Sequence, residues 1–410
     1  MSSAGVRKIN PNLTEYVLDH RLPLLLYVGD VTVESTFAGS ALLYRLLQNY
    51  PVKRLRVIEG SLSVSHPCKR LPGVEYWKLR VGTERLLRTR FHPLYSSLLH
   101  LTATLRLGQL DRIEKQFRPE AILTVAQGYT WVTAACIAKK LNLPLHLIIH
   151  DDWVSVQENV LPARIHKRVK QQFKEIYQLA ESRLCVSPYL VEDFGKKYGV
   201  TGTVLYPSRA ADVPEYSHPP ISNGSRKKIV AAFAGTINTP GYASSLATLT
   251  SVLENLGGEL IVYSNLSDID IKNCGLDKSN VINRPILPFK ELLHSLRKEV
   301  DVLFVPMSFR MEDAQNMKVS FPSKLADYTV VGLPLLIWGP PYCSAVRWAR
   351  ENPGVAEVVT KFDKEELTKA IKHLSQDLDY RYKLAEVALQ KGREFFSHST
   401  AINKFYKSIT

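Results

Sequence analysis

The stretch from residue 321 to residue 341, FPSKLADYTVVGLPLLIWGPP, decides how the second half of this chain folds. Pro322 suits the first turn of a helix, where a missing backbone N–H costs no hydrogen bond. Gly332 favours the end of that helix, and Pro334 prevents its continuation. The apolar run at 335–337 is typical of a buried parallel strand. The stretch therefore predicts a short helix that leads directly into a strand.

The first turn of this predicted helix carries Ser323, Lys324 and Asp327. Ser323 is expected to cap the turn by accepting a hydrogen bond from a backbone N–H. Because a helix N-terminus attracts anions, a phosphate can bind beside Lys324 while Asp327 accepts hydrogen bonds from a ribose diol. An ordinary capped helix with a solvated Lys–Asp pair three residues apart explains the same spacing. Spacing alone favours this ordinary helix.

The composition is that of a globular protein, with 45% hydrophobic and 22% charged residues among 410. A chain of this length usually forms two domains. The sequence has no apolar run of about 18 residues or more, and its first residues, MSSAGVRK, lack the apolar core of a signal peptide. The five cysteines are scattered and form neither a metal motif nor a disulfide framework. We therefore expect a two-domain protein in a reducing compartment such as the cytoplasm.

The formal net charge is +14, and much of the basic excess lies in the first half of the chain. A basic surface attracts anionic membranes, phosphorylated substrates or nucleic acid. A solvated face that only keeps the protein soluble explains the excess equally well. The basic residues concerned include Lys53, Arg54, Arg56, Lys69, Arg70, Lys78, Arg80, Arg85, Arg88 and Arg90.

Residues 84–117 alternate arginines with leucines and aromatic residues, which is typical of helical hairpins with a basic outer face. Such helices can lie on a membrane surface with their arginines near lipid phosphates. Apolar positions with this spacing are more often part of a core, and a core role is the expectation that we favour. The apolar positions are Leu86, Leu87, Phe91, Leu94, Tyr95, Leu98, Leu99, Leu101 and Leu105.

Short apolar runs alternate with helical patterns along both halves of the chain, as in parallel sheets that helices cover on both faces. A segment rich in Pro, Ser and Asn separates the two halves as a linker would. We therefore predict an α/β protein with two Rossmann-like domains that face each other across a cleft. The predicted parts are an N-terminal domain over 1–207, a linker over 208–228, a C-terminal domain over 229–380 and a helical tail over 381–410 that can return to the first domain.

Two places in the first half are candidates for a ligand site. His150 and Asp151 follow the predicted strand 145–149, and functional groups of open α/β sheets gather at the carboxyl ends of strands. His146 lies within that strand and is expected to be a core residue. Gly39 lies at the start of a predicted helix and would let a ligand approach the backbone closely, although a well-packed turn also explains a single glycine.

Several short motifs follow one another over most of the chain. They are LIIHDDW at 147–153, CVSPYL at 185–190, FAGT at 233–236, VINRP at 281–285 with ELL at 291–293 and DVLFVP at 301–306, and PSKLADY at 322–328 with GLP at 332–334. In kind and in order these motifs resemble those of the GT-B glycosyltransferases, and most closely those of family 4 among the retaining enzymes. The resemblance implies the GT-B fold and a nucleotide sugar bound mainly to the second domain.

The resemblance also implies roles for residues of the second domain. Lys324 would contact the diphosphate of the donor, with Ser323 beside it, and Asp327 would hold the ribose hydroxyls. Gly235 and Thr236, in the glycine turn that opens this domain, would approach the diphosphate.

Further positions carry over in the same way. Arg284, Pro285 and Ile286 would lie near the base of the nucleotide. In the first domain, Gly39 would border the diphosphate and His150 would reach the transferred sugar.

Three departures from the family pattern concern donor binding. Val319 stands where the family often has a glutamate, and Asp327 is one methylene shorter than the family's usual glutamate. Residues 237–242 lack the Arg and Lys that often follow the glycine turn, which leaves Arg310 or Lys318 as substitutes. These departures keep open a protein of the same shape without catalytic activity.

From the resemblance we expect a retaining glycosyltransferase that needs neither metal nor cofactor and uses a nucleotide sugar, most readily a UDP- or GDP-sugar. Fixed N–H groups, a helix dipole and a lysine can stabilise a leaving diphosphate without a metal ion. A surface polysaccharide, a glycolipid or a polyprenyl-linked glycan would suit the basic first domain, through peripheral contact with the inner face of the cell membrane. The alternatives are a non-catalytic binding or regulatory protein, a nucleotide-sugar epimerase and, last, a nucleic-acid-binding protein.

Overall fold

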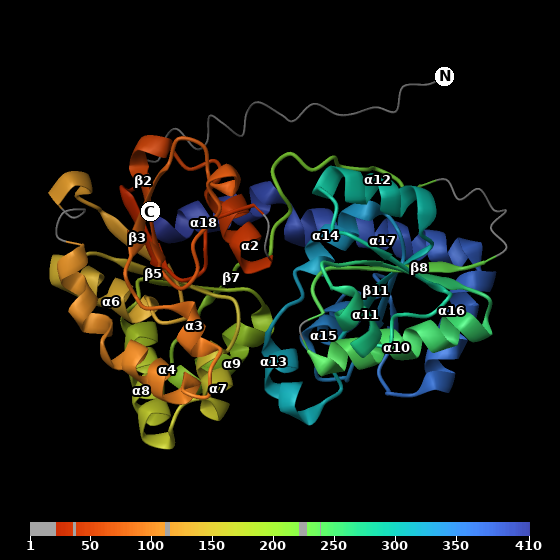
Figure 1. The fold of residues 1–410 in the computed structure, drawn as a ribbon. Coiled ribbons are helices and arrows are strands. Elements are labelled where there is room, and N and C mark those ends of the chain that lie inside the picture. Colours follow the sequence, from red (N-terminus) through yellow and green to blue (C-terminus); the bar gives the residue numbers. More distant parts are fainter. Residues whose placement is uncertain (1–21, 36–37, 111–114, 221–227, 238) are drawn as a thin grey trace. The chain divides into compact units, whose positions relative to one another are not determined.

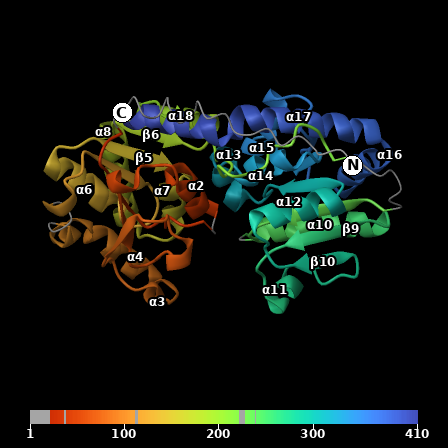
Figure 2. The same ribbon diagram turned by 90° about the horizontal axis from the view of Figure 1, so that it is seen from above.

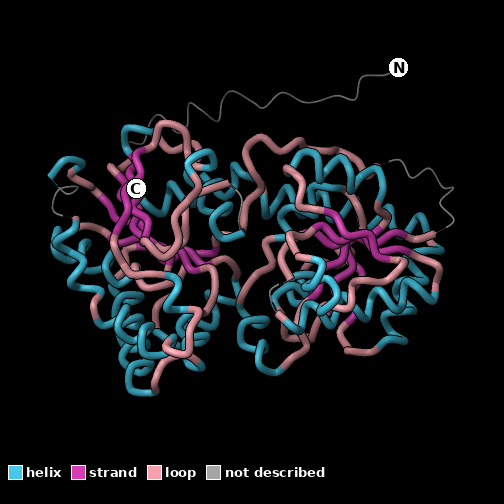
Figure 3. The backbone as a smooth tube through the Cα atoms, viewed as in Figure 1, coloured by secondary structure: helices cyan, strands magenta, loops and turns pink. Residues whose placement is uncertain are grey.

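The computed structural model describes residues 22–35, 38–110, 115–220, 228–237 and 239–410. The chain divides into two compact units (Figure 1). The N-terminal unit comprises the described residues of Ile9–Ser208 together with His398–Thr410, and the C-terminal unit comprises those of Arg209–Ser397. In each unit the strands form a middle layer between helices (Figure 3), so the predicted α/β class is confirmed.

The N-terminal unit is built on a seven-stranded sheet in the order β3-β2-β1-β4-β5-β6-β7, in which all neighbouring strands are parallel. Its central strands are buried apolar runs, as expected for a sheet covered on both faces. The sequence analysis does not predict β3, because this edge strand mixes polar and apolar residues (EYWKL). The strands are β1 (Leu25–Gly29), β2 (Leu55–Gly60), β3 (Glu75–Leu79), β4 (Ala121–Val125), β5 (Leu145–Ile149), β6 (Ser182–Cys185) and β7 (Thr203–Val204).

Helices cover both faces of this sheet. On one face, α2 (Ala38–Leu47) and the C-terminal helix α18 (His398–Ile409) share an apolar core with the strands. On the other, aromatic rings of α6 (Trp131–Leu141), α8 (Ala163–Leu179) and α9 (Pro188–Tyr198) pack against one another. The other helical segments described here are η1 (Val52–Arg54), η2 (Pro67–Lys69), α3 (Glu84–Leu87), α4 (His92–Leu101), η3 (Ala103–Gln109), α7 (Trp153–Val156) and η4 (Gln157–Asn159).

The C-terminal unit is built on a six-stranded sheet in the order β10-β9-β8-β11-β12-β13, again with parallel neighbours only. Figure 2 shows β10 at one edge, with β9 beside it. The apolar run at 335–337 that the sequence analysis singles out falls on β12. The strands are β8 (Val230–Ala234), β9 (Glu259–Tyr263), β10 (Val281–Arg284), β11 (Val302–Pro306), β12 (Leu335–Trp338) and β13 (Glu357–Val359).

Helices also cover both faces of the second sheet. One face packs against α10 (Pro240–Asn255) and α16 (Lys364–Gln376) in a continuous apolar core. The other face carries α12 (Phe289–Glu299), α14 (Lys324–Val331) and α17 (Leu378–Phe396) (Figure 1). The remaining described helices of this unit are α11 (Asp268–Asn273), η5 (Met311–Asp313), α13 (Ala314–Val319) and α15 (Ser344–Glu351).

The stretch 321–341 folds as a helix followed by a strand, as predicted. Gly332 ends α14 with φ 74°, a left-handed conformation that favours glycine, and β12 begins three residues later. The prediction that Ser323 caps α14 is wrong, because its side chain accepts no capping hydrogen bond from a backbone N–H of this helix. Ser323 already has helical backbone angles (φ −56°, ψ −23°), whereas a capping side chain needs an extended backbone to reach back. Backbone bonds from Leu325 N to Pro322 O (3.0 Å) and from Ala326 N to Ser323 O (3.1 Å) close the first turn instead.

Among the leucines of α4 and η3 for which the sequence analysis favours a core role, Leu99 is buried, and the others are exposed. Leu94, Leu98 and Leu105 are 71%, 52% and 78% exposed. The face that α4 turns inward carries Ser96 and His100 instead, which contact Tyr129 by a hydrogen bond and a ring contact. Of the described helices, none combines the length and the apolar character that crossing a membrane requires.

Candidate functional site

In the C-terminal unit, the sheet brings Gly235 and Lys324 together at the carboxyl end of β8. Gly235 has φ +138°, a conformation that L side chains rarely adopt. A Cβ atom at this position would lie 2.7 Å from Lys324 Cε and 2.9 Å from Lys324 Nζ. The lysine side chain therefore crosses directly over the glycine backbone. Its ammonium also lies 4.8 Å from the ring centroid of Phe233.

The surroundings of Lys324 disfavour its positive charge. The residue is half-buried, and burial lowers its pKa from 10.5 to about 8, although the nearby carboxylate of Asp327 acts in the opposite direction. Among the described residues, no hydrogen-bond acceptor satisfies the ammonium. A phosphate that binds beside Lys324 would supply the missing negative charge and acceptor oxygens.

A tyrosine fixes α14 relative to β8. The hydroxyl of Tyr328 accepts a hydrogen bond from Ala234 N at 2.7 Å, and burial raises the pKa of this tyrosine. Arg209 also binds this helix, by donating hydrogen bonds to Ala326 O (3.3 Å) and to Thr329 Oγ1 (3.2 Å). These contacts hold Lys324 in register with the glycine turn.

The structure places Asp327 on the turn of α14 that follows Lys324, where it is half-buried. Thr236 is exposed in the loop between Gly235 and α10. The side chain of Ser323 lies at the start of the same helix and is half-buried. Four of the predicted donor-site residues thus accompany Gly235 near the end of β8 or at the amino end of α14.

The other predicted donor residues lie at the edge of the sheet. Arg284 ends β10, and its guanidinium forms an ion pair with Glu299 of α12 (2.7 Å) and a hydrogen bond to Tyr263 Oη (2.9 Å). This ion pair lowers the pKa of Glu299. Arg284 therefore anchors α12 to the sheet, and Pro285 and Ile286 are exposed in the loop after β10.

Two departures from the family pattern have structural counterparts. Val319 is completely buried, so this position belongs to the core of the unit. Gly241, in the first turn of α10, packs against Ser308, whose hydroxyl donates to Asp313 at 2.5 Å. Of the two proposed substitutes for the missing basic pair, Arg310 pairs with Glu312 (3.3 Å) and Lys318 is exposed.

In the N-terminal unit, Gly39 and His150 are neighbours. A Cβ atom on Gly39 would lie 3.4 Å from His150 Nδ1. That nitrogen is buried and has no hydrogen-bond partner among the described residues. Burial lowers the pKa of His150, and Asp151 acts in the opposite direction. His150 also lines a small cavity of about 20 Å³ with Leu42 and other residues of this unit, so a neutral imidazole with an unused nitrogen faces the start of α2.

His146 lies in the core as predicted, 2% exposed, with Nδ1 at 2.8 Å from Ser182 Oγ. Burial lowers its pKa to about 4, so it stays neutral at physiological pH.

Sequence reasoning missed Asp30, which follows β1 at the same sheet edge as His150. Its Oδ2 accepts hydrogen bonds from Tyr129 N (2.5 Å) and Thr130 N (2.8 Å), and burial raises its pKa. Cβ atoms on Gly60 or Gly128 would lie 1.9 Å and 2.4 Å from its carboxylate oxygens. Asp30 could have been identified from the sequence, because it directly follows an apolar strand. His150 was identified from the same position relative to its strand.

Among the described residues, no group of three or more His, Cys, Asp and Glu side chains is arranged to hold a metal ion.

Among the comparisons with known proteins, only the one with solved structures finds similar proteins. No protein-family model matches the sequence, and no curated protein matches it by sequence. Many solved structures are similar to the chain in fold, and three of them are described here. Alr3699/HepE from Anabaena, in complex with UDP and glucose, is 13% identical, covers 94% of this chain and 99% of its own, and has a TM-score of 0.67.

The other two similar structures are enzymes by their descriptions. The sucrose-phosphate synthase of Thermosynechococcus elongatus is 12% identical, covers 95% of this chain and 99% of its own, and has a TM-score of 0.66. A glycosyltransferase from Rickettsia africae is 13% identical, covers 94% and 97%, and has a TM-score of 0.64. The likeness over almost the whole chain shows that this protein has the GT-B fold that its motifs predict.

Proposed function

We propose that this protein is a retaining glycosyltransferase of family 4 type, which transfers a sugar from a nucleotide sugar to an acceptor without a metal ion. The observation that carries the proposal is the half-buried ammonium of Lys324, which lies across the backbone of Gly235 at the carboxyl end of a parallel sheet. This arrangement is suited to a diphosphate. The motifs around it are those that resemble the family.

The chemistry follows from where charge develops. As the bond between the anomeric carbon and the diphosphate breaks, the phosphate oxygen keeps the electron pair and gains negative charge. The ammonium of Lys324 and the N–H groups at the glycine turn can stabilise that charge. The acceptor hydroxyl attacks the anomeric carbon on the face that the diphosphate leaves, and its proton passes to the departing phosphate. The neutral His150 would hold a hydroxyl of the transferred sugar through a hydrogen bond.

UDP is the nucleotide that we propose first, because HepE, which has the same fold, was solved with UDP and glucose. A GDP-sugar is the second choice. Calorimetric titration of the protein with UDP, GDP and ADP, and with their sugars, identifies the base. We expect micromolar to millimolar binding of one diphosphate and the loss of that binding in Lys324→Met. Binding that does not distinguish the variant from the wild type would exclude the proposed site.

The acceptor that we propose is a lipid-linked or surface glycan, which the basic N-terminal unit would meet at the inner face of the cell membrane. Incubation with a donor and extracted membrane lipids, followed by mass spectrometry of the products, tests this class of acceptor. A lipid-linked product supports it, and transfer only to a soluble sugar would exclude it.

A non-catalytic nucleotide-binding protein is the second candidate, because Val319 is buried in the core and the basic pair after Gly235 is missing. Release of free nucleotide from a bound donor separates the two functions. An epimerase would instead convert the donor sugar in the absence of any acceptor, which product analysis detects.

A further inference from the structure

The helix α4 has the reverse of the usual polarity of a surface helix. Its buried residues are Ser96, Ser97, Leu99 and His100, of which only Leu99 is apolar. Its outward face carries Leu94, Leu98 and Leu101, spaced four and three residues apart and therefore on one side of the helix. A helix that covers a core does the opposite, with apolar residues inward and polar residues outward.

The inward face is held by specific contacts, so the orientation of α4 is not arbitrary. Ser96 Oγ and Tyr129 Oη lie 2.9 Å apart. The ring of His100 packs against the rings of Tyr129 and Trp153, at centroid distances of 4.9 and 5.5 Å. Tyr129 lies in the loop after β4, and Trp153 begins α7, which follows β5, so α4 is fixed at the sheet edge where His150 lies.

We call the exposed apolar side chains on and beside this helix the α4 patch. It begins on the turn before α4 and continues into η3. Its members are Phe91, Leu94, Leu98, Leu101 and Leu105, each more than 40% exposed.

Positive charge borders the α4 patch. Arg85 lies on α3, which packs beside α4, and Arg88 directly follows α3. The guanidinium of Arg90 lies 5.0 Å from the ring centroid of Phe91. Arg88 pairs with Glu84 of α3. Cations beside exposed apolar side chains are typical of segments that lie in the headgroup region of a membrane.

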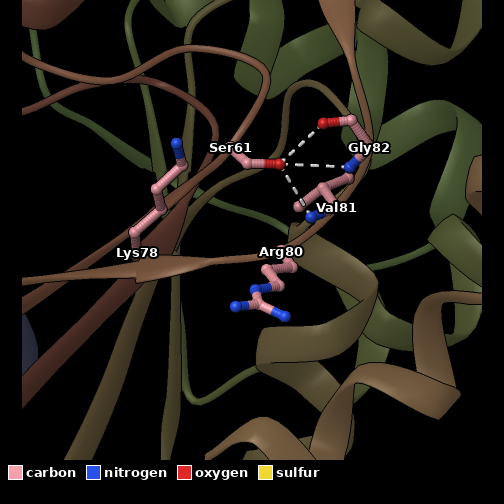
Figure 4. A pocket seen from close by; sticks show the side chains of 5 residues that line it. All are labelled: Ser61, Lys78, Arg80, Val81 and Gly82. Carbon is pink, nitrogen blue, oxygen red and sulfur yellow. Dashed lines mark hydrogen bonds between the residues drawn. The ribbon is translucent and has the colours of Figure 1, made fainter.

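An open pocket of about 690 Å³ lies at the end of β3 (Figure 4). Lys78 and Arg80 line it together with Ser61 and Gly82. Ser61 Oγ accepts hydrogen bonds from the backbone of Val81 and Gly82 at 2.9 and 3.1 Å and donates to Gly82 O, which fixes the loop.

The cations of this pocket stay available, because neither the Lys78 ammonium nor the Arg80 guanidinium has a partner among the described residues. The loop also contacts α4 directly. The N–H of Thr83 donates to Tyr95 Oη at 2.7 Å, and a Cβ on Gly82 would lie 3.0 Å from Leu99. The loop that lines the pocket thus packs against α4, the helix that carries the patch.

We propose that the α4 patch and the Lys78–Arg80 pocket form a docking surface for an anionic membrane. Leucine and phenylalanine side chains enter the boundary between headgroups and acyl chains, and the two cations of the pocket bind the phosphate of a lipid headgroup. Charge complementarity favours a bilayer over a second copy of this chain, because a second copy would bring like charges together. The inference extends the proposed membrane contact, and the test below needs no sugar transfer, so either proposal can fail alone.

The test is co-sedimentation with vesicles of phosphatidylcholine alone and with vesicles that contain phosphatidylglycerol. Two double variants probe the surface: Leu94→Ser with Leu98→Ser, and Lys78→Gln with Arg80→Gln. Two matched double variants at the opposite, amino edge of the same sheet serve as controls. They are Leu179→Ser with Val52→Ser, which also change exposed apolar residues, and Lys53→Gln with Arg118→Gln, which also change exposed cations.

We expect the wild type and both controls to bind the anionic vesicles and to bind neutral ones at least tenfold more weakly. Each probe variant should bind the anionic vesicles at least tenfold more weakly, and added salt should weaken wild-type binding. Unchanged melting curves show that the probe variants are folded.

Three results would overturn the proposal. They are equal binding to neutral vesicles, unchanged binding by both probe variants, and a wild-type dimer that ignores vesicles and dissociates when the leucines are changed. The last result would assign the α4 patch to a second copy of this chain.

Discussion

Replacing Lys324 by methionine separates the function of this lysine from its effect on stability. Methionine keeps most of the apolar stem that crosses Gly235 and removes the ammonium. Burial lowers the pKa of Lys324 from 10.5 to about 8, so the unfolded chain holds this proton more tightly than the folded chain. The charged lysine therefore destabilises the fold at every pH below about 8, and the destabilisation disappears as the pH rises from about 8 to 10.5.

The size of the effect follows from the same two values. Their difference corresponds to about 3 kcal/mol, and solvent around the half-buried ammonium reduces it. We expect Lys324→Met to raise the free energy of unfolding of the C-terminal unit at pH 7 by about 1–3 kcal/mol, or its melting temperature by about 2–8 °C. The gain should shrink as the pH approaches 10.5. Lys372→Met, which changes an exposed lysine of α16, should shift stability by less than about 0.5 kcal/mol.

The same variant should lose nucleotide binding. A diphosphate beside Lys324 restores its pKa toward 10.5, so UDP binding takes up nearly one proton at about pH 9, and the Kd of the wild type rises about eightfold between about pH 7.5 and pH 9. Calorimetry in buffers of different ionisation enthalpy measures this uptake. Lys324→Met should bind UDP at least about tenfold more weakly, without the proton uptake. A variant less stable than the wild type, or one with unchanged affinity and proton uptake, would refute the reasoning.

Three further substitutions test the site. His150→Ala should lower turnover by about 10²-fold and change nucleotide affinity by less than about threefold, because the histidine faces the sugar; equal losses in kinetics and calorimetry would contradict this role. Tyr328→Phe should lower the free energy of unfolding by about 1–3 kcal/mol in urea, because Ala234 N loses its buried acceptor, and unchanged stability would show that water replaces it. Gly235→Ala should lower stability by about 1–3 kcal/mol, because φ is +138° there, and should weaken UDP binding by displacing the Lys324 side chain; a variant that melts and binds UDP like the wild type would count against the close contact.

The sheet strands could be predicted because most of them are uninterrupted apolar runs between turn signals. Gly332 and Pro334 similarly marked the end of α14. The edge strand β3 lacked this signal, since only one side of it pairs with the sheet and its residues are mixed. Short helices such as α7 and α13 were also missed, because four to six residues are too few to show a helical period.

The orientation of α4 could not be predicted from its sequence. Leucines at Leu94, Leu98 and Leu101 share one face, and periodicity alone does not say whether that face lies inward. The structure turns it outward because Ser96 and His100 find partners inside. Whether a surface of this kind contacts a membrane depends on its charged border, which the helix pattern alone does not show.

The candidate site was only partly accessible from the sequence. Lys324 and Gly235 are far apart in the chain, and only the pairing of β8, β11 and β12 brings them together. Their roles came from the motif resemblance, and spacing alone favoured an ordinary helix. The pKa of Lys324 depends on burial by residues from several elements, so no local pattern could have indicated it.

A structure of the protein with UDP bound tests the central claim most directly. The account predicts that the diphosphate lies within hydrogen-bond distance of Lys324 Nζ, beside the backbone of Gly235 and at the amino end of α14. A diphosphate bound elsewhere, with Lys324 Nζ out of its reach, would contradict the account.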